Sequence, residues 1–321
     1  MAGLTGGLLY YGRCGVPSGR VSRPARGMGP GLLAPGPEPP YTSPRMGDFA
    51  EDTAVDGRDG RYHARLSRDW AIWGPNGGYV AAIALRAAGA ATALRRPASF
   101  AGQFLNVAEF ADVDLEVTPL RVSSRAACLR VSMTQGARPI FVAVVWVVGE
   151  TSGLAHDVAV MPSVPPPGDL QPIEALLTPD ERAMRHRFWQ NLEERPIEFV
   201  HWSRRPVGAP VWREWYRYRP RATFDDPFVD AARALLLIDT MVWPATCSAY
   251  APTDRAVIAP SLDVTAQFHR LVPDSEWLLC DASAPVAVDG LIGGRSSIWS
   301  ADGRLVASGT AHLLCRPAPR A

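Results

Sequence analysis

Two long apolar helical segments, each followed by a series of strand-like segments, constrain the fold of this chain most strongly. Residues 79–94 are rich in alanine and residues 228–248 in alanine and leucine, and both are apolar on almost every side. Such helices must be covered, and the segments that follow can form the covering sheets. Extended segments are predicted at 61–68, 100–107, 112–121, 124–134 and 139–148, and again at 196–203, 211–219, 259–270, 276–284, 288–299 and 304–315.

The two halves correspond closely enough to indicate an internal duplication. Gln103-Phe104 and Gln267-Phe268 occupy equivalent places, and Gln135-Gly136 and Asp302-Gly303 mark equivalent hairpin turns. An antiparallel sheet wrapped around one long buried helix is a hot-dog unit. The sequence therefore predicts an α+β fold with two such units in tandem, a double hot-dog.

Composition suggests how the chain is divided. Residues 1–45 contain eight Pro, ten Gly and a single acid, so we expect a disordered extension, either dispensable or the product of a mis-set start codon. The N-terminal hot-dog is placed at 46–150 and the C-terminal one at 195–317. Between them, 151–194 is expected to be a Pro-rich linker followed by a surface helix over about 179–194, which starts at a capping box at Thr178.

The basic residues exclude several classes of enzyme. The chain contains 33 arginines and no lysine. The absence of lysine rules out P-loop, pyridoxal Schiff-base, kinase-type and Ser–Lys chemistry on this chain. The formal net charge of +1 does not favour nucleic acid or an anionic membrane as partner.

The remaining motif searches indicate a chain without a metal or cofactor. No apolar run approaches the roughly 18 residues of a membrane span, and no Gly-x-Ser-x-Gly elbow is present. The six histidines lack metal-ligand spacing, and no strand–GxGxxG–helix unit occurs. Five widely spaced cysteines are typical of free thiols in a reducing cytosol, so we expect a cytoplasmic protein.

The start of the first helix is the first candidate site. Trp73 leads into Asn76, Gly77 and Gly78, where free amide groups at a helix N-terminus can polarise a carbonyl or bind an anion. Alternatively, the two glycines merely let the strand pack on the helix.

The second candidate is Asp239, an acid within the apolar second helix. Burial of a carboxylate is costly unless it is paired or functional, and burial would raise its pKa towards that of a general base. A solvent-facing position or a neighbouring hydroxyl would be the structural alternative. The first helix has no acid, so any chemistry is asymmetric between the halves.

The third candidate is the strand that begins at Ser261. Strict alternation would place Ser261, Asp263 and Thr265 on one face, either lining a site or facing solvent.

Several of these segments resemble the acyl-CoA thioesterase II family of double hot-dog thioesterases. They are Pro75–Tyr79, the Ser261–Arg270 strand with Trp277-Leu278-Leu279 behind it, and Asp302–Ser308. The resemblance covers about 50–316 and implies hydrolysis of fatty acyl-CoA without metal or cofactor. It implies that Asp239, five residues before Pro244, activates water together with Ser261. It also implies an acyl tunnel shaped by Trp70, Trp73 and the buried helices, with arginines binding the CoA phosphates.

The chain departs from the family at one position. The family's third residue, a Gln on the final strand that orients water, is replaced by Ala311. Catalysis could proceed on Asp239 and Ser261 alone, use Gln267 or Asn76 as another donor, or be lost. The alternative function is a degenerate protein that binds acyl-CoA or an acylated partner without hydrolysis; an enoyl-CoA hydratase is less favoured, because no Asp–His pair spans the helix start. A homo-oligomer is left open.

Overall fold

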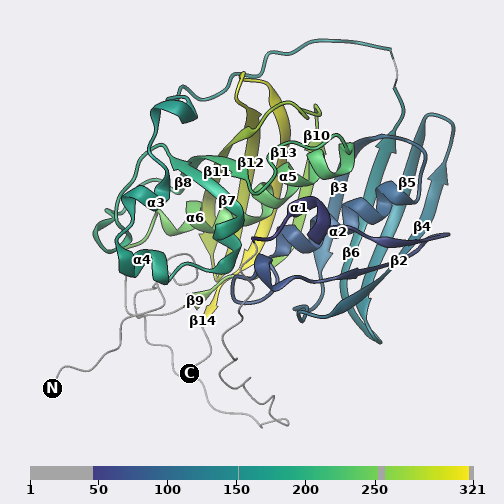
Figure 1. Ribbon diagram of the computed structural model, residues 1–321, viewed down its shortest axis with the longest axis horizontal. Coiled ribbons are helices and arrows are strands. Elements are labelled where there is room, and N and C mark those ends of the chain that lie inside the picture. The colour runs from purple at the N-terminus through teal and green to yellow at the C-terminus, as the bar shows by residue number, and fades with distance from the viewer. Residues whose placement is uncertain (1–45, 151, 252–256, 318–321) are drawn as a thin grey trace, which may run out of the picture.

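The computed structural model describes residues 46–150, 152–251 and 257–317, and most of its strands belong to one twelve-stranded antiparallel sheet (Figure 1). The strand order is β1-β2-β4-β5-β6-β3-β10-β13-β12-β11-β8-β7. The strands of the first half are β1 (Asp56–Arg58), β2 (Arg61–Arg65), β3 (Arg96–Phe104), β4 (Asp112–Val122), β5 (Ala126–Gln135) and β6 (Arg138–Val148). Those of the second half are β7 (Leu192–Pro196), β8 (Val211–Tyr218), β10 (Ser261–Phe268), β11 (Trp277–Val288), β12 (Leu291–Ser300) and β13 (Leu305–Leu314).

The two halves join through their first strands after the helices. β3 pairs with β10 in antiparallel register, with Ala101 opposite Thr265, so a single sheet runs through the whole molecule. A separate two-stranded sheet is formed by β9 (Val257–Ile258) and β14 (Arg316–Pro317). This arrangement is the tandem hot-dog that the duplicated sequence pattern predicts.

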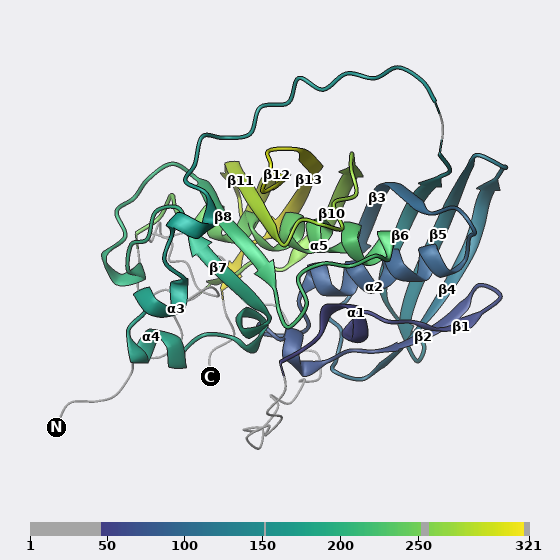
Figure 2. The same cartoon turned by 45° about the horizontal axis from the view of Figure 1, so that its top comes forward.

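Two long buried helices, α2 (Gly77–Ala90) and α5 (Pro227–Thr240), pack against one face of the sheet and against each other (Figure 2). They are antiparallel: Gly78 at the start of α2 lies against Leu236 near the end of α5, whereas Gly89 lies against Phe228 at the start of α5. The N-terminus of each helix therefore lies beside the C-terminus of the other. Only small side chains permit such a close approach between two backbones.

The second predicted helix, 228–248, is divided into α5 and the short α6 (Val242–Cys247). Pro244 explains the division, because it has no N–H to donate to the carbonyl of Thr240 and its ring clashes there. The first helix spans Gly77–Ala90 rather than 79–94, since Asn76 caps it at the glycines.

The surface helix expected over 179–194 is wrong beyond its first turns. The capping box at Thr178 is present, but the helix that it begins, α4, spans only Pro179–Ala183. Residues Leu192–Pro196 form the edge strand β7, paired with β8, and the side chain of Glu194 is fully buried. The charges of this segment therefore do not mark a solvated face. This strand also replaces the one predicted at 196–203.

Short elements complete the fold. They are α1 (Phe49–Asp52), α3 (Ile173–Leu176) and the 3₁₀ turns Arg68–Trp70, Pro167–Asp169, Arg187–Asn191 and Trp202–Arg204. In the part of the chain that is described, no helix is long and apolar enough to cross a membrane. The extension predicted at 1–45 lies outside the described residues.

Candidate active site

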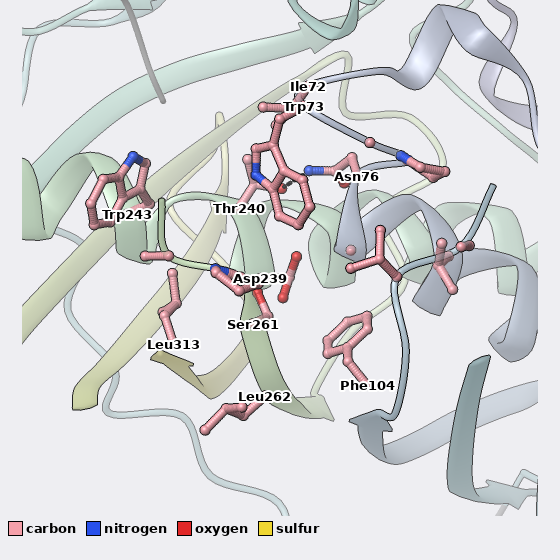
Figure 3. Close-up of a pocket in the computed structure, with 18 of the residues that line it drawn as sticks. Ile72, Trp73, Asn76, Phe104, Asp239, Thr240, Trp243, Ser261, Leu262 and Leu313 are labelled. Atoms are coloured by element: carbon pink, nitrogen blue, oxygen red, sulfur yellow. Dashed lines mark hydrogen bonds between the residues drawn. The ribbon is translucent and has the colours of Figure 1, made fainter. Parts of the chain in front are cut away.

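A pocket of about 270 Å³ opens where the N-terminus of α2 meets the C-terminus of α5 (Figure 3). Its wall is mostly apolar, and few of its side chains carry a polar group: those of Asn76, Asn106, Asp239, Thr240, Ser261 and Arg316, apart from the indoles. The apolar members include Ile72, Val80, Phe104, Ile140, Trp189, Trp243 and Leu313. An apolar pocket with few convergent polar groups is the usual form of a small-molecule site.

Asp239 occupies the last turn of α5 and its carboxylate points into this pocket, as Figure 3 shows. The residue is 3% exposed. A Cβ placed on Gly77 would lie 2.7 Å from Oδ2 of Asp239, so a glycine at the start of α2 is what leaves room for the carboxylate. The antiparallel packing of the helices thus delivers the acid of one half to the helix N-terminus of the other.

Burial raises the pKa of Asp239 to about 6, because desolvation disfavours the charged form. Hydrogen bonds from the Ser261 side chain and the Gly78 backbone N–H oppose that effect, and the nearby charge of Asp263 adds to it. The carboxylate oxygen Oδ1 is buried and has no hydrogen-bond partner among the described residues. A carboxylate of this kind, facing an apolar pocket, is suited to accept a proton from a bound water.

A β-bulge places Ser261 on the inner face of the sheet. β10 pairs with β13 through Ser261 opposite Leu313 and then Asp263 opposite His312, so one extra residue stands on β10 between them. Ser261 therefore faces the pocket with buried Leu313, which strict alternation did not predict. The expectation of one polar face for Ser261, Asp263 and Thr265 is wrong for this reason.

Asp263, Thr265 and Gln267 lie on the outer face of the sheet instead. Asp263 contacts His312 at 3.1 Å, and the hydroxyls of Thr265 and Thr310 are 2.7 Å apart. Gln267 alternates with the buried Ala266 and Phe268, so its side chain points away from the helices. Gln267 therefore does not line the pocket of Asp239, and its role in substrate binding stays a prediction from the sequence.

The final strand supplies no polar side chain to the inner face at Ala311. This residue is fully buried and paired with Val264, while its neighbours Thr310 and His312 lie on the exposed outer face. The alternation expected around Ala311 is therefore confirmed.

The two glycines at the start of α2 are required for different reasons. Gly77 lines the pocket beside Asp239, whereas a Cβ on Gly78 would lie 2.6 Å from Cα and 2.7 Å from the carbonyl oxygen of Leu236. Gly78 is thus needed for helix–helix packing, which corresponds to the structural alternative, although the partner is a helix.

Asn76 joins the two helix ends. Its Oδ1 accepts the N–H of Tyr79 at 2.9 Å as the N-cap of α2, and its Nδ2 donates to Oγ1 of Thr240 at 3.0 Å. Thr240 is a pocket residue that the sequence did not single out. The signal that could have revealed it is Pro244, which ends α5 at Thr240.

The two tryptophans of the preceding loop differ in role. Trp73 is 46% exposed and lies at the pocket, above Asp239 in Figure 3. Trp70 is fully buried, stacks on Tyr79 and donates from Nε1 to Asp52. It does not line the pocket, and the expectation that it shapes an acyl tunnel is wrong.

One arginine at the pocket could bind an anion, but the described residues offer no cluster of metal ligands. Arg316, an exposed residue of β14, is the arginine that lines the pocket. Within the described ranges, no group of three or more His, Cys, Asp or Glu side chains is arranged to hold a metal ion.

Several solved structures resemble this fold. One is a hot-dog protein of unknown function from Alicyclobacillus acidocaldarius, with 22% identity, a TM-score of 0.69 and coverage of 85% of this chain and 98% of that one. Another is a putative thioesterase from Novosphingobium aromaticivorans, with 25% identity, a TM-score of 0.65 and coverage of 81% and 97%. A third is an acyl-CoA thioesterase II from Mycobacterium marinum, with 22% identity, a TM-score of 0.65 and coverage of 84% and 99%.

Comparison with curated proteins gives no match. Comparison with family profiles gives two, which follow one another along the chain. Residues 66–148 match the acyl-CoA thioesterase N-terminal domain, and residues 165–314 match the acyl-CoA thioesterase C-terminal domain. Together they span both halves of the sheet, and the chain belongs to the acyl-CoA thioesterase family.

Proposed function

We propose that this protein hydrolyses acyl-CoA thioesters with a water activated by Asp239. The observation that carries the proposal is the buried carboxylate of Asp239, whose Oδ1 has no protein partner among the described residues and which faces an apolar pocket. Its pKa of about 6 leaves it mostly ionised at neutral pH yet basic enough to take a proton.

The reaction proceeds in two steps. The oxygen of the water bonds to the thioester carbon while Asp239 takes a proton from that water, and the π electrons of the carbonyl move onto its oxygen. Collapse of this tetrahedral intermediate re-forms the carbonyl and breaks the C–S bond. The departing CoA thiolate takes the proton back from Asp239, so the enzyme is regenerated with a fatty acid and CoA as products.

Other pocket residues have supporting roles in this proposal. Ser261 hydrogen-bonds Asp239 and helps to keep it ionised. The Gly77 N–H, at the start of α2, is the backbone donor available to the carbonyl, because the Gly78 N–H is engaged by Asp239. The apolar wall accommodates the acyl chain, and Arg316 at the rim is placed to bind a CoA phosphate.

The alternative function is binding of acyl-CoA or an acylated partner without hydrolysis. Ala311 favours it, because at this inner-face position β13 has no polar side chain that could orient the water. The homo-oligomer and the cytoplasmic location stay predictions from the sequence.

One assay separates the two functions. Release of free CoA thiol from acyl-CoA substrates of increasing chain length is measured for the wild type and for Asp239→Asn. Hydrolysis by the wild type and a loss of about 10²–10⁴-fold in kcat in the variant support the proposal. Undiminished hydrolysis by Asp239→Asn refutes the role of Asp239, and binding without thiol release by the wild type selects the alternative.

A further inference from the structure

Thr240 presents a second hydroxyl to the pocket beside the proposed base. It is the last residue of α5, directly after Asp239, and its side chain lines the same pocket although it is only 8% exposed. Figure 3 shows it between Asn76 and Asp239. The mechanism above assigns this hydroxyl no role.

Asn76 determines how the Thr240 hydroxyl is oriented. The Asn76 carbonyl oxygen Oδ1 must face the Tyr79 N–H, which it accepts at 2.9 Å. The amide Nδ2 then faces Thr240, and it donates to Oγ1 at 3.0 Å in a buried contact. The Thr240 oxygen is therefore an acceptor toward Asn76, and its own proton must point elsewhere.

The usual destination of that proton is not used. Helical hydroxyls commonly donate to the carbonyl four residues earlier, as Thr246 does to Val242 at 2.8 Å and Ser248 to Pro244 at 3.1 Å. The Thr240 hydroxyl makes no such bond, and it has no acceptor anywhere in the described ranges. The oxygen of this buried hydroxyl accepts a hydrogen bond, but its proton has no protein acceptor among the described residues. Such a proton is available to a bound ligand.

We propose that the Thr240 hydroxyl donates a hydrogen bond to the carbonyl oxygen of the bound thioester; this inference rests on the proposed function. The carbonyl oxygen becomes negative in the tetrahedral intermediate, so a donor placed there stabilises the transition state more than the substrate. A donor to the attacking water would instead occupy a lone pair of the nucleophile.

The other donors near the base support this assignment. The Ser261 hydroxyl and the Gly78 N–H already hydrogen-bond Asp239, and Ala311 has no polar group. Of the two hydroxyls that line the pocket, Ser261 is bonded to Asp239, whereas the Thr240 proton has no acceptor among the described residues. Asn76 keeps this hydroxyl oriented and is thus a positioning residue.

Thr240→Val tests the proposal, because valine keeps the shape and removes the hydroxyl. We expect kcat for thiol release to fall about 10²–10³-fold with little change in KM, as for loss of one oxyanion donor. Thr240→Ser is expected to restore kcat to within several-fold of the wild type. Thr246→Val makes the same substitution in α6, outside the pocket, and is expected to keep wild-type kcat.

Two non-hydrolysable analogues distinguish a carbonyl contact from a structural role. An acyl-CoA ketone, in which CH₂ replaces sulfur, keeps the carbonyl, whereas an S-alkyl-CoA thioether lacks it. Thr240→Val is expected to weaken binding of the ketone about tenfold and to leave binding of the thioether unchanged. If variant and wild type bind the ketone with equal affinity, or if the variant keeps the wild-type kcat, the proposed role of Thr240 is overturned and the proposed function is not affected.

Failure of the proposed function gives a different pattern. If the wild type releases no thiol but binds the analogues, the loss of ketone affinity in Thr240→Val still supports the contact with the carbonyl, and hydrolysis alone is refuted. If the wild type binds neither analogue, both the proposed function and this inference are overturned.

Discussion

The two ends of the α2–α5 helix pair occupy equivalent positions in the two halves of the chain, but one end is open at a pocket and the other is filled by a side chain. Both helices have fourteen residues, so aligning their first residues makes Gly89 of α2 the counterpart of Asp239 in α5. At one end Asp239 lies beside Gly77 in the wall of the pocket. At the other end, Gly89 lies directly against the ring of Phe228, the counterpart of Gly78.

The strand beside each end shows the same contrast. Alignment of Gln103-Phe104 with Gln267-Phe268 makes Pro97 the counterpart of Ser261. The register shifts fall at these two places, between Pro97 and Ser99 in β3 and between Ser261 and Asp263 in β10. The duplicated backbone therefore keeps the bulge, while only the second copy carries a hydroxyl there.

This contrast shows what makes one end a candidate active site. The backbone frame is shared, and a few side chains make the difference. The open end has Asp239, Ser261 and Gly78 at the positions where the filled end has Gly89, Pro97 and Phe228. A filled end stabilises the helix pair, whereas an open end with a buried carboxylate costs stability, a cost that the proposed function would explain.

Gly77→Ala should affect activity at the open end most strongly. The added Cβ would lie 2.7 Å from Oδ2 of Asp239 and 3.1 Å from Cζ of Phe104, so the carboxylate must move. A displacement on the order of 1 Å costs about 10²-fold in turnover. Kinetics of thiol release and thermal unfolding measure the two effects, and we expect the free energy of unfolding to change little. Wild-type turnover in this variant would contradict the close approach of α2 to the base.

Gly89→Ala, at the filled end, should have the opposite profile. The new Cβ would lie 2.5 Å from Cγ of Phe228, whose ring is buried and cannot move aside freely. We expect the free energy of unfolding to fall by about 1–2 kcal/mol, since overpacking exceeds the gain in helix propensity. Denaturant unfolding checks this value, and kcat should remain that of the wild type. A large loss of kcat with unchanged stability would show that the two ends are not distinct.

Ser261→Ala makes the strand of the open end resemble that of the filled end, where Pro97 has no hydroxyl. We expect turnover to fall about tenfold, as for loss of one hydrogen bond to a charged group. That hydrogen bond lowers the pKa of Asp239, so the apparent pKa in the pH–rate profile should rise in the variant. Ser308→Ala, which removes a hydroxyl bonded to His269 on the outer face, is the matched control. An unshifted apparent pKa in Ser261→Ala would contradict the contact.

The two N-caps allow the smallest comparison. Asn76 caps α2 and Asp226 caps α5, each accepting a backbone N–H of its own helix. Replacement of either by alanine should cost about 1 kcal/mol in the free energy of unfolding. Asn76→Ala should lower kcat in addition, because it releases the Thr240 hydroxyl, whereas Asp226→Ala should not. Equal kcat in the two variants would argue against a positioning role for Asn76.

The sequence predicted the parts of this molecule that depend on local pattern. Two buried helices, their strands and the asymmetry introduced by Asp239 follow from periodicity and from the cost of burying an acid. The outward position of Gln267 and the inward position of Ser261 were not predicted, because one bulge residue changes the face of a side chain without altering composition.

Other features depended on contacts between distant segments. The edge strand at Leu192–Pro196 is stabilised by pairing with β8, so the helix that begins at the capping box does not extend to residue 194. The contact between Asn76 and Thr240 joins residues 164 positions apart and follows only from the antiparallel packing of α2 and α5. Neither has a local sequence signal strong enough to predict it.

The pH dependence of thiol release tests the central claim most directly. If Asp239 must be ionised to accept a proton, kcat/KM should rise with pH through the pKa of about 6 and level off above it. Glu194 and Glu214 also have raised pKa values through burial, so the profile must be compared with that of Asp239→Asn, which leaves both acids in place. We predict that the wild type shows this rise and that the variant has little activity and no such rise. A flat wild-type profile, or a variant that keeps the wild-type rate and profile, would contradict it.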